Sequence, residues 1–210
     1  MSREVNHPFF ARFLARVAAR AEGGDEDHLR RELLAGLSGR VIEVGSGSGP
    51  NFRLYPETVS ELVAVEPEDY LRAKAEEAAA PMGRPIRVID ALADRLPFED
   101  SFFDAAVVAQ VLCSVPDQAA ALAELRRVIK PGGELRFYEH VLAREPRHAR
   151  FQRLAGHVTP RLAGGCHPDR DTGRAIEGAG FTIERCRRFD FRLSFLDYPV
   201  APRILGAARR

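Results

Sequence analysis

Short apolar runs alternate with longer segments of mixed polarity between residues 39 and 141 of the chain. Five of these runs predict strands, near Arg40–Val44, Glu61–Glu66, Ile86–Asp90, Phe103–Ala109 and Glu134–Tyr138. Helical patterns lie between several of them, near Glu68–Ala80 and Asp117–Ile129. Strands that alternate with helices are typical of a parallel sheet covered on both faces.

The last part of the chain completes this sheet. Phe181–Phe189 and roughly Phe195–Gly206 predict two further strands that form an antiparallel pair, and a helix near Asp169–Ala179 precedes them. Pro199 and Pro202 indicate that the final strand starts late or is interrupted, because proline cannot donate a ladder hydrogen bond.

A variable insert, residues 142–168, separates the fifth strand from that last helix. Phe151, Leu154 and Val158 fall three and four residues apart, which predicts a helix with one core-like face. The segment is rich in arginine and histidine, and we expect this basic face to be solvated. Contact with an anionic substrate group is the functional alternative.

Residues 1–38 predict two helices, the first opened by Pro8 and the second running from Asp25 to about Leu37. Their apolar stripe suits a cover over one edge of the sheet. A lid that closes Phe9 and Phe10 over a ligand, or a helix in peripheral contact with a membrane surface, are the alternatives. We expect residues 39–210 to form one domain with this cover.

Composition narrows the class of protein. The chain has 210 residues, 45% of them hydrophobic, and a net charge of +1, which suits one soluble domain and gives no reason to expect nucleic acid. Its three cysteines, Cys113, Cys166 and Cys186, form no disulfide framework, so we expect a reducing cytoplasm. No apolar run approaches the roughly 18–20 residues that span a bilayer.

A glycine-rich turn follows the first strand and marks the candidate site. Gly45, Gly47 and Gly49 are spaced two apart, and Pro50 follows at once. A strand that runs into such a turn and then a helix is how open α/β sheets bind nucleotides. The dinucleotide pattern G-x-G-x-x-G has a longer spacing, so a diphosphate fits this turn less well.

Two acids beside this turn favour a cationic adenosine ligand. Glu43 lies two residues before Gly45, where burial of a carboxylate requires a partner, and an amino group of the ligand would supply one. Glu66 ends the second strand, where a carboxylate can accept hydrogen bonds from a ribose diol. Its alternative role is that of a partner for the N-terminus of the helix that follows.

These residues resemble the class I S-adenosylmethionine-dependent methyltransferases. VIEVGSGSG matches their first motif, and Glu66 matches their ribose-binding acid. Leu92–Asp104 and Leu125–Leu135 match the stretches that precede the fourth and fifth strands. The resemblance implies a Rossmann-like sheet of seven strands in the order 3-2-1-4-5-7-6, and S-adenosylmethionine as the cofactor.

A closer resemblance rests on Val111–Asp117, Phe137–His140 and Gly164–His167, which read VLCSVPD, FYEH and GGCH. These look like the methyltransferase-like family whose animal members methylate small alkyl thiols. The quinone methylases of the UbiE type are more distant relatives. The animal members begin with a membrane-anchoring apolar segment that we do not find in this sequence.

The resemblance also implies roles for particular residues. Glu43 would lie near the amino group of the cofactor, and Gly45, Ser46, Gly47 and Gly49 would form the turn beneath its methionine part. Glu66 would hold the ribose, with Pro67 beside the adenine, and backbone groups of Leu92 and Ala93 would contact the adenine edge. Gln110 and Val111 would face the sulfonium. The acceptor is expected to be a small molecule. A thiol or a phenol- or quinol-like group are the candidates, and the acceptor atom stays open among sulfur, oxygen, nitrogen and carbon.

The candidate base is His140, because it ends the fifth strand at the edge where the ligand crevice opens. The alternative for His140 is a packing role or a place at the edge of the ribose. Glu139 beside it could balance His140 or orient a substrate cation, or it could point away, because adjacent strand residues face opposite sides. We expect Cys113 to be a buried structural cysteine. Cys166 and His167 are adjacent, but two ligands do not make a zinc site, so no metal is predicted.

Two other classes of function remain open at this point. An oxidoreductase that binds NAD shares the strand, the glycines and the acid. A protein that binds S-adenosylmethionine without catalysing a reaction would share the whole cofactor pocket.

Overall fold

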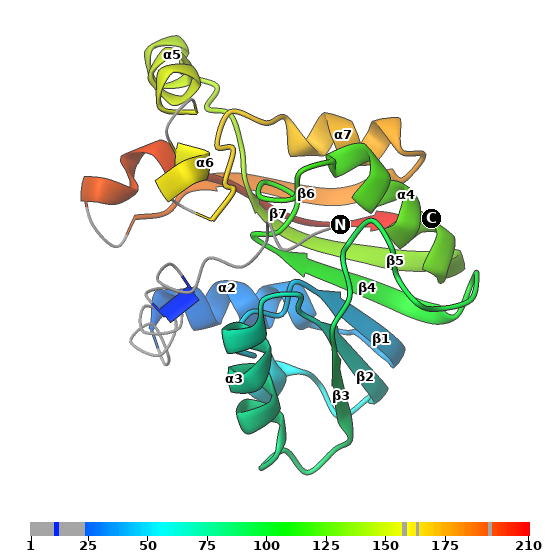
Figure 1. The fold of residues 1–210 in the computed structure, drawn as a ribbon. Coiled ribbons are helices and arrows are strands. Elements are labelled where there is room, and N and C mark those ends of the chain that lie inside the picture. Colours follow the sequence, from blue (N-terminus) through cyan, green and yellow to red (C-terminus); the bar gives the residue numbers. More distant parts are fainter. Residues whose placement is uncertain (1–10, 13–23, 157–158, 163, 193–194) are drawn as a thin grey trace.

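The computed structural model describes residues 11–12, 24–156, 159–162, 164–192 and 195–210. Within them the chain forms a seven-stranded sheet in the order β3-β2-β1-β4-β5-β7-β6 (Figure 1), which confirms the predicted fold class. The strands are β1 (Gly39–Val44), β2 (Val59–Val65), β3 (Ile86–Ile89), β4 (Phe103–Ala109), β5 (Ile129–His140), β6 (Thr182–Asp190) and β7 (Pro202–Arg209).

The first five strands run parallel, and β7 pairs antiparallel with both β5 and β6. In the centre of the sheet, Glu43 of β1 lies between Ala64 of β2 and Val107 of β4. The carboxyl ends of these strands therefore meet at one edge, which is where open α/β sheets place their ligands.

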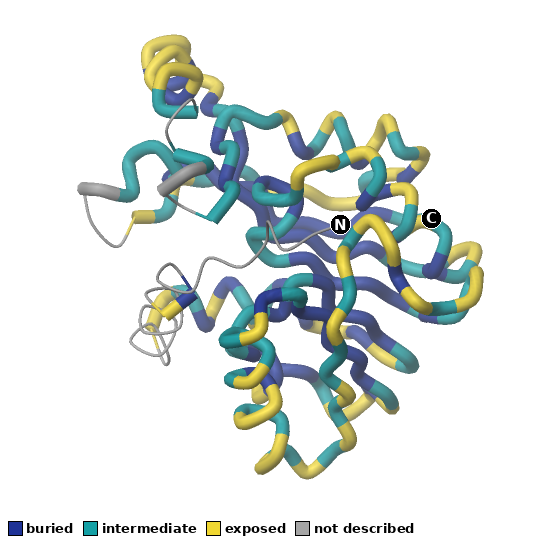
Figure 2. Tube along the Cα trace, in the orientation of Figure 1, coloured by how far each residue is buried: buried dark blue, intermediate teal, exposed yellow. Residues whose placement is uncertain are grey.

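Helices cover both faces. The helices of the described residues are α2 (Asp25–Leu34), α3 (Asp69–Ala79), α4 (Gln118–Val128), α5 (Pro146–Ala155), α6 (Thr159–Leu162) and α7 (Thr172–Gly178), with 3-10 turns η1 (Phe52–Leu54) and η2 (Phe195–Val200). Ile42 and Val44 pack with α4 and α7, whereas Val41 packs with α2 and η1, as alternation along a strand requires. Strands β1, β2, β4, β5 and β7 form the buried centre of the molecule (Figure 2), whereas β3 and β6 at the two edges are more exposed.

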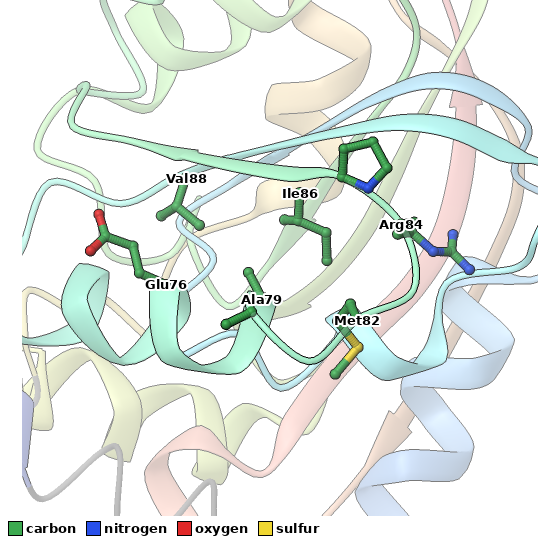
Figure 3. Close-up of a pocket in the computed structure, with 8 residues that line it drawn as sticks. Glu76, Ala79, Met82, Arg84, Ile86 and Val88 are labelled. Atoms are coloured by element: carbon green, nitrogen blue, oxygen red, sulfur yellow. The ribbon is translucent and has the colours of Figure 1, made fainter.

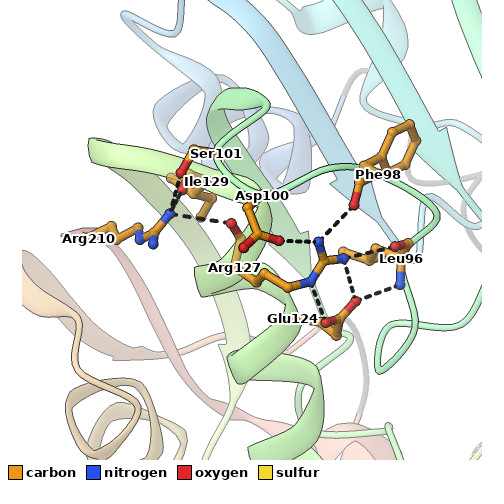
Figure 4. A network of polar contacts seen from close by, with 8 residues as sticks. All are labelled: Leu96, Phe98, Asp100, Ser101, Glu124, Arg127, Ile129 and Arg210. Atoms are coloured by element: carbon orange, nitrogen blue, oxygen red, sulfur yellow. Dashed lines mark hydrogen bonds and ion pairs between the residues drawn. The ribbon is translucent and has the colours of Figure 1, made fainter.

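Arg127 ties the long segment before β4 to helix α4 (Figure 4). Its guanidinium donates to the carbonyls of Leu96 and Phe98 and to the carboxylates of Asp100 and Glu124. Glu124 in turn accepts from the backbone N–H of Leu96. These bonds hold residues 96–100 in place, although this segment has no regular secondary structure of its own.

Two strands differ most from the predicted boundaries. β5 is longer at both ends, because residues 129–133 already belong to the strand and its carboxyl end pairs with β7 through His140 and Arg203. The prediction that a strand begins at Phe195 is wrong, since residues 195–200 form η2 and β7 begins at Pro202. Pro199 lies inside η2, so the two prolines delay the strand as expected.

The insert helix α5 contradicts its apolar pattern. Phe151 and Leu154 are 44% and 66% exposed, and Val158 lies outside the described residues. The buried side chains are instead His148, Ala149 and Gln152. The helix packs on loops rather than on the sheet, and loops present carbonyls that need hydrogen-bond donors.

Most of the predicted N-terminal cover lies outside the described residues, including Phe9, Phe10 and Phe13. Its second helix is α2, whose Leu29, Leu33 and Leu34 are buried against the sheet. None of the described helices combines the length and the apolar character needed to cross a membrane.

Candidate functional site

The glycine turn after β1 depends on backbone conformations that other residues adopt poorly. Gly45 and Gly49 have φ angles of +69° and +81°. A Cβ atom on Gly45 would lie 2.5 Å from a methyl group of Val111, and one on Gly49 would lie 2.6 Å from the ring of Phe52. The turn therefore needs glycine both for its φ angles and for close packing.

The same turn has an open side. Gly47 has a φ of +58°, and a Cβ atom there would meet no other atom within 4 Å. The hydroxyl of Ser46 is buried without a hydrogen-bond partner. A buried polar group without a partner is costly, so a ligand with polar atoms fits this turn.

Glu66 joins the turn to the start of α3. One carboxylate oxygen accepts from the backbone N–H of Gly47 at 2.8 Å, and the other from that of Glu68 at 3.0 Å. Burial raises the pKa of Glu66. The N-cap of α3 is Glu68, which accepts from Leu71. Glu66 bonds the backbone N–H of that N-cap residue, so its alternative role as a partner for the helix N-terminus is met in part.

Glu43 finds its partners inside the chain. Its oxygens accept from the amide of Asn51 at 2.7 Å and the hydroxyl of Tyr55 at 2.9 Å. Burial raises its pKa to about 7. The argument that a ligand amino group must offset its burial is corrected, because Asn51 and Tyr55 supply these bonds. Asn51 and Tyr55 lie four residues apart directly after the glycines, and these two polar residues were the sequence signal that could have identified them as partners.

Gln110 and Val111 come directly after β4, as predicted, and adjoin the glycine turn through the contact of Val111 with Gly45. Gln110 has a φ of +62°, a strained conformation for a residue with a Cβ atom. Its N–H donates to the carbonyl of Tyr138 at 2.6 Å. Strain that the surroundings impose on a residue is common at functional sites.

The predicted adenine side is more open. Pro67 is partly buried and Leu92 is 42% exposed, while Ala93 packs against the core. The carbonyl of Leu92 accepts from the N–H of Arg95 in a tight turn.

Glu139 points into the protein and holds the loop after β4. Its carboxylate accepts from the backbone N–H groups of Val111, Leu112 and Cys113 at 2.9–3.0 Å. It is fully buried. Of the roles considered for Glu139, the structure favours the one in which it points away from His140, because both of its oxygens accept from the loop after β4.

His140 ends β5 and lies between two thiols. Its Nδ1 is 3.5 Å from the Sγ of Cys113 and 3.6 Å from the Sγ of Cys166. Cys113 is buried, as predicted, but it has a basic neighbour that the sequence concealed. The neighbouring Cys166 thiol and burial raise the pKa of Cys113 to about 12, which makes it a poor nucleophile.

Comparison with known proteins decides the family. A family model described as a methyltransferase domain matches residues 42–137. The chain is 34% identical to the thiol S-methyltransferase TMT1B of Mus musculus, over 95% of this chain and 85% of the relative. The chain belongs to the class I S-adenosylmethionine-dependent methyltransferases.

More distant likenesses agree with this methyltransferase family. The ubiquinone/menaquinone biosynthesis C-methyltransferase UbiE of Syntrophotalea carbinolica is 32% identical over 64% of this chain and 58% of the relative. A crystal structure titled as a putative methyltransferase from Bacillus halodurans has the same fold. Its TM-score is 0.71 at 19% identity, and the match covers 88% of this chain and 98% of that one. The predicted cofactor, S-adenosylmethionine, and the predicted transfer to a small molecule are confirmed at the level of the family.

One hollow on this methyltransferase lies away from the edge where the predicted site residues gather. It measures about 330 Å³ and lies between the end of α3 and the start of β3, lined among others by Met82, Arg84 and Ile86 (Figure 3). That is the amino edge of the parallel strands. The glycine turn, Glu66, Gln110 and His140 all lie at the carboxyl edge, where such sheets bind ligands.

Proposed function

We propose that this methyltransferase transfers the methyl group of S-adenosylmethionine to the sulfur of a small thiol. The observation that carries the proposal is the extent of the likeness to the thiol S-methyltransferase. It covers 95% of the chain, whereas the methyltransferase domain model ends at residue 137. The likeness therefore extends into the insert and the final strands, where acceptor contacts of this fold are expected, rather than into the cofactor half alone.

The proposed cofactor site takes its residues from four strand ends. They are Glu43, Gly45, Ser46, Gly47, Gly49, Glu66, Pro67, Leu92, Ala93, Gln110 and Val111. The open side of Gly47 and the unpartnered hydroxyl of Ser46 support a ligand above the turn. Glu66 would hold the ribose while it orders Gly47. Glu43 would not touch the cofactor itself. It would position the loop that carries the glycines through its hydrogen bond with Asn51.

The cofactor supplies the reactive methyl group, so the chain mainly has to position and desolvate the acceptor. A thiol reacts as its thiolate. The acceptor end must therefore supply a base or a cation that stabilises the sulfur anion. His140, whose Nδ1 lies beside the thiols of Cys113 and Cys166, is the candidate for this base.

We propose one domain at 39–210 with a cover formed by residues 1–38. The packing of α2 on the sheet supports the cover, as does Arg12, whose guanidinium lies 5.6 Å from the ring centre of Tyr70 in α3. A cytoplasmic location and a small-molecule acceptor complete the proposal. The absence of a disulfide among the three cysteines is consistent with that location.

Two measurements test the proposal. Calorimetry with S-adenosylhomocysteine tests the cofactor site, and the absence of binding at millimolar ligand would contradict it. Incubation with labelled cofactor and matched panels of small thiols, phenols and amines tests the acceptor. We expect label in the thioethers alone. Label in the phenols with none in the thiols would reject sulfur as the acceptor and favour the quinol alternative.

A further inference from the structure

Cys113, His140 and Cys166 lie together, and a general base would need only the histidine of these three. The three side chains come from the loop after β4, the end of β5 and the insert, and all three are buried. We infer that they bind one divalent cation of the zinc type. The fourth coordination position would take the thiolate of the acceptor, and this second part rests on the proposed function.

The distances fit a shared ion. A tetrahedral zinc with Zn–S of about 2.3 Å and Zn–N of about 2.0–2.1 Å separates nitrogen from sulfur by about 3.6 Å. Nδ1 of His140 is 3.5 Å and 3.6 Å from the two sulfurs. The two sulfurs lie within 4.8 Å of each other, and such a zinc would hold them about 3.8 Å apart.

Hydrogen bonding accounts for part of this arrangement, since the Sγ of Cys113 also lies 3.5 Å from the hydroxyl oxygen of Ser114. Nδ1 carries either one proton or one lone pair, so it makes one well-aligned bond, with one of the two sulfurs. The other sulfur at the same distance then lacks a matching partner on that atom. A cation accepts electron pairs from all three atoms together, and two thiolates with an imidazole are the ligands preferred by zinc over magnesium or calcium.

The chain also holds the three ligands in place, as metal sites require. The three bonds from Glu139 fix the backbone that carries Cys113. The N–H of His167 donates to the carbonyl of Cys113 at 2.8 Å, which docks the insert on that loop. Gly165 has a φ of +86°, and a Cβ atom there would lie 2.7 Å from the carbonyl of Ser114. Glycine is thus needed where Cys166 approaches.

Three protein ligands leave one position open, which is typical of a catalytic zinc rather than a structural one. An acceptor thiol would bind there as its thiolate and release its proton to solvent. The sulfur lone pair then forms the new carbon–sulfur bond while the bond from the methyl carbon to the sulfonium breaks. A thioether and neutral S-adenosylhomocysteine result. The cation would serve in place of the base predicted for His140.

Metal analysis of the full-length chain tests the inference. After growth with zinc and purification without chelator, we expect about one zinc per chain. Cys113→Ser, Cys166→Ser and His140→Ala should each lose it. Cys186→Ser is the matched control, because that cysteine is exposed on β6, and it should keep the zinc. S-adenosylhomocysteine binding by each variant reports whether it has folded.

Cobalt provides a second readout that needs no variant. Co²⁺ added to the metal-free protein should give the charge-transfer absorption of thiolate ligands, and a small alkyl thiol should then change that spectrum. Zinc that stays in all three variants would be an adventitious ion only. That outcome overturns the inference, and so does the absence of both zinc and the cobalt band. An intact mass that reveals a disulfide between Cys113 and Cys166 in the purified protein also overturns it.

The outcomes separate this inference from the proposed function. Stoichiometric zinc without methylation of thiols would keep the metal site and reject the acceptor. Methylation of thiols at an unchanged rate by metal-free protein would keep the acceptor and reject the role of the cation.

Discussion

The two ends of the ligand edge are built by different means. At the cofactor end, glycines shape the backbone, and Glu66 captures the N–H of Gly47 directly. At the acceptor end, long polar side chains reach across the molecule to loop backbone. Glu139 holds three N–H groups of the loop after β4, and Gln152 of the insert bonds four separate backbone groups.

This difference determines which end each kind of substitution harms. At the cofactor end the glycine backbone sets the shape of the turn, although Glu43, Asn51 and Glu66 are buried there as well. The acceptor end rests on single side chains whose removal leaves several buried backbone groups without partners. We therefore expect substitution of Glu139 or Gln152 to reduce stability, and substitution of Glu66 to reduce affinity for the cofactor.

The largest effect is expected for Glu139→Ala. Three backbone donors lose their acceptor in a buried loop, which costs about 3–5 kcal/mol of unfolding free energy. Urea denaturation followed by circular dichroism measures it. Lys130→Ala is the control on the same strand, because its ion pair with Asp104 is about 40% exposed on both sides and should contribute less than about 1 kcal/mol. Equal losses in the two variants would contradict this reading of Glu139.

A pH-dependent effect is expected at Glu43. Its folded pKa of about 7 exceeds the usual value of 4.5, so the folded protein binds a proton that the unfolded chain has released. Its contribution to stability is full below pH 4.5 and is lost as the pH rises through 7, by up to about 3 kcal/mol. Glu43→Gln should lack this loss. Between pH 5.5 and pH 8, urea unfolding should therefore show a smaller loss of unfolding free energy for the variant than for the unmodified protein. Equal losses in the two proteins would refute the raised pKa of Glu43.

A smaller loss of stability is expected for Gln152→Ala. The side chain accepts from Ala143 and donates to the carbonyls of Val141, Pro168 and Pro199, so its removal should cost about 2 kcal/mol. Leu154→Ala on the same helix is the control. Leu154 is 66% exposed, and its removal should change stability by less than about 0.5 kcal/mol. The apolar pattern of α5 predicts the opposite order, so this pair of variants tests the pattern against the structure.

The same contrast explains which features of the fold and the site could be predicted from the sequence. Strand order follows from local patterns and a family resemblance, and it was predicted correctly. Glu66 lies against the glycine turn, and the part that both take in binding the cofactor stays a prediction. The partners of Glu43 were accessible in principle, because Asn51 and Tyr55 follow the glycines closely. The grouping of Cys113 with His140 and Cys166 was not, because it joins residues 26 and 27 positions apart through the tertiary fold. Nor does periodicity reveal a buried glutamine such as Gln152.

The smallest effect is expected at the cofactor end, and it concerns affinity. Glu66→Ala should weaken binding of S-adenosylhomocysteine at least about tenfold, because charge-assisted bonds to the ribose are lost. Glu61→Ala is the control on the same strand, since Glu61 pairs with Arg40 away from the ligand edge. Calorimetry measures both. Glu66→Asp separates two causes of the loss, because the shorter side chain keeps the charge but withdraws it from Gly47. If Glu66→Asp binds as weakly as Glu66→Ala, the order that Glu66 imposes on the glycine turn matters as much as its charge. Unchanged affinity in all three variants would place the ribose elsewhere.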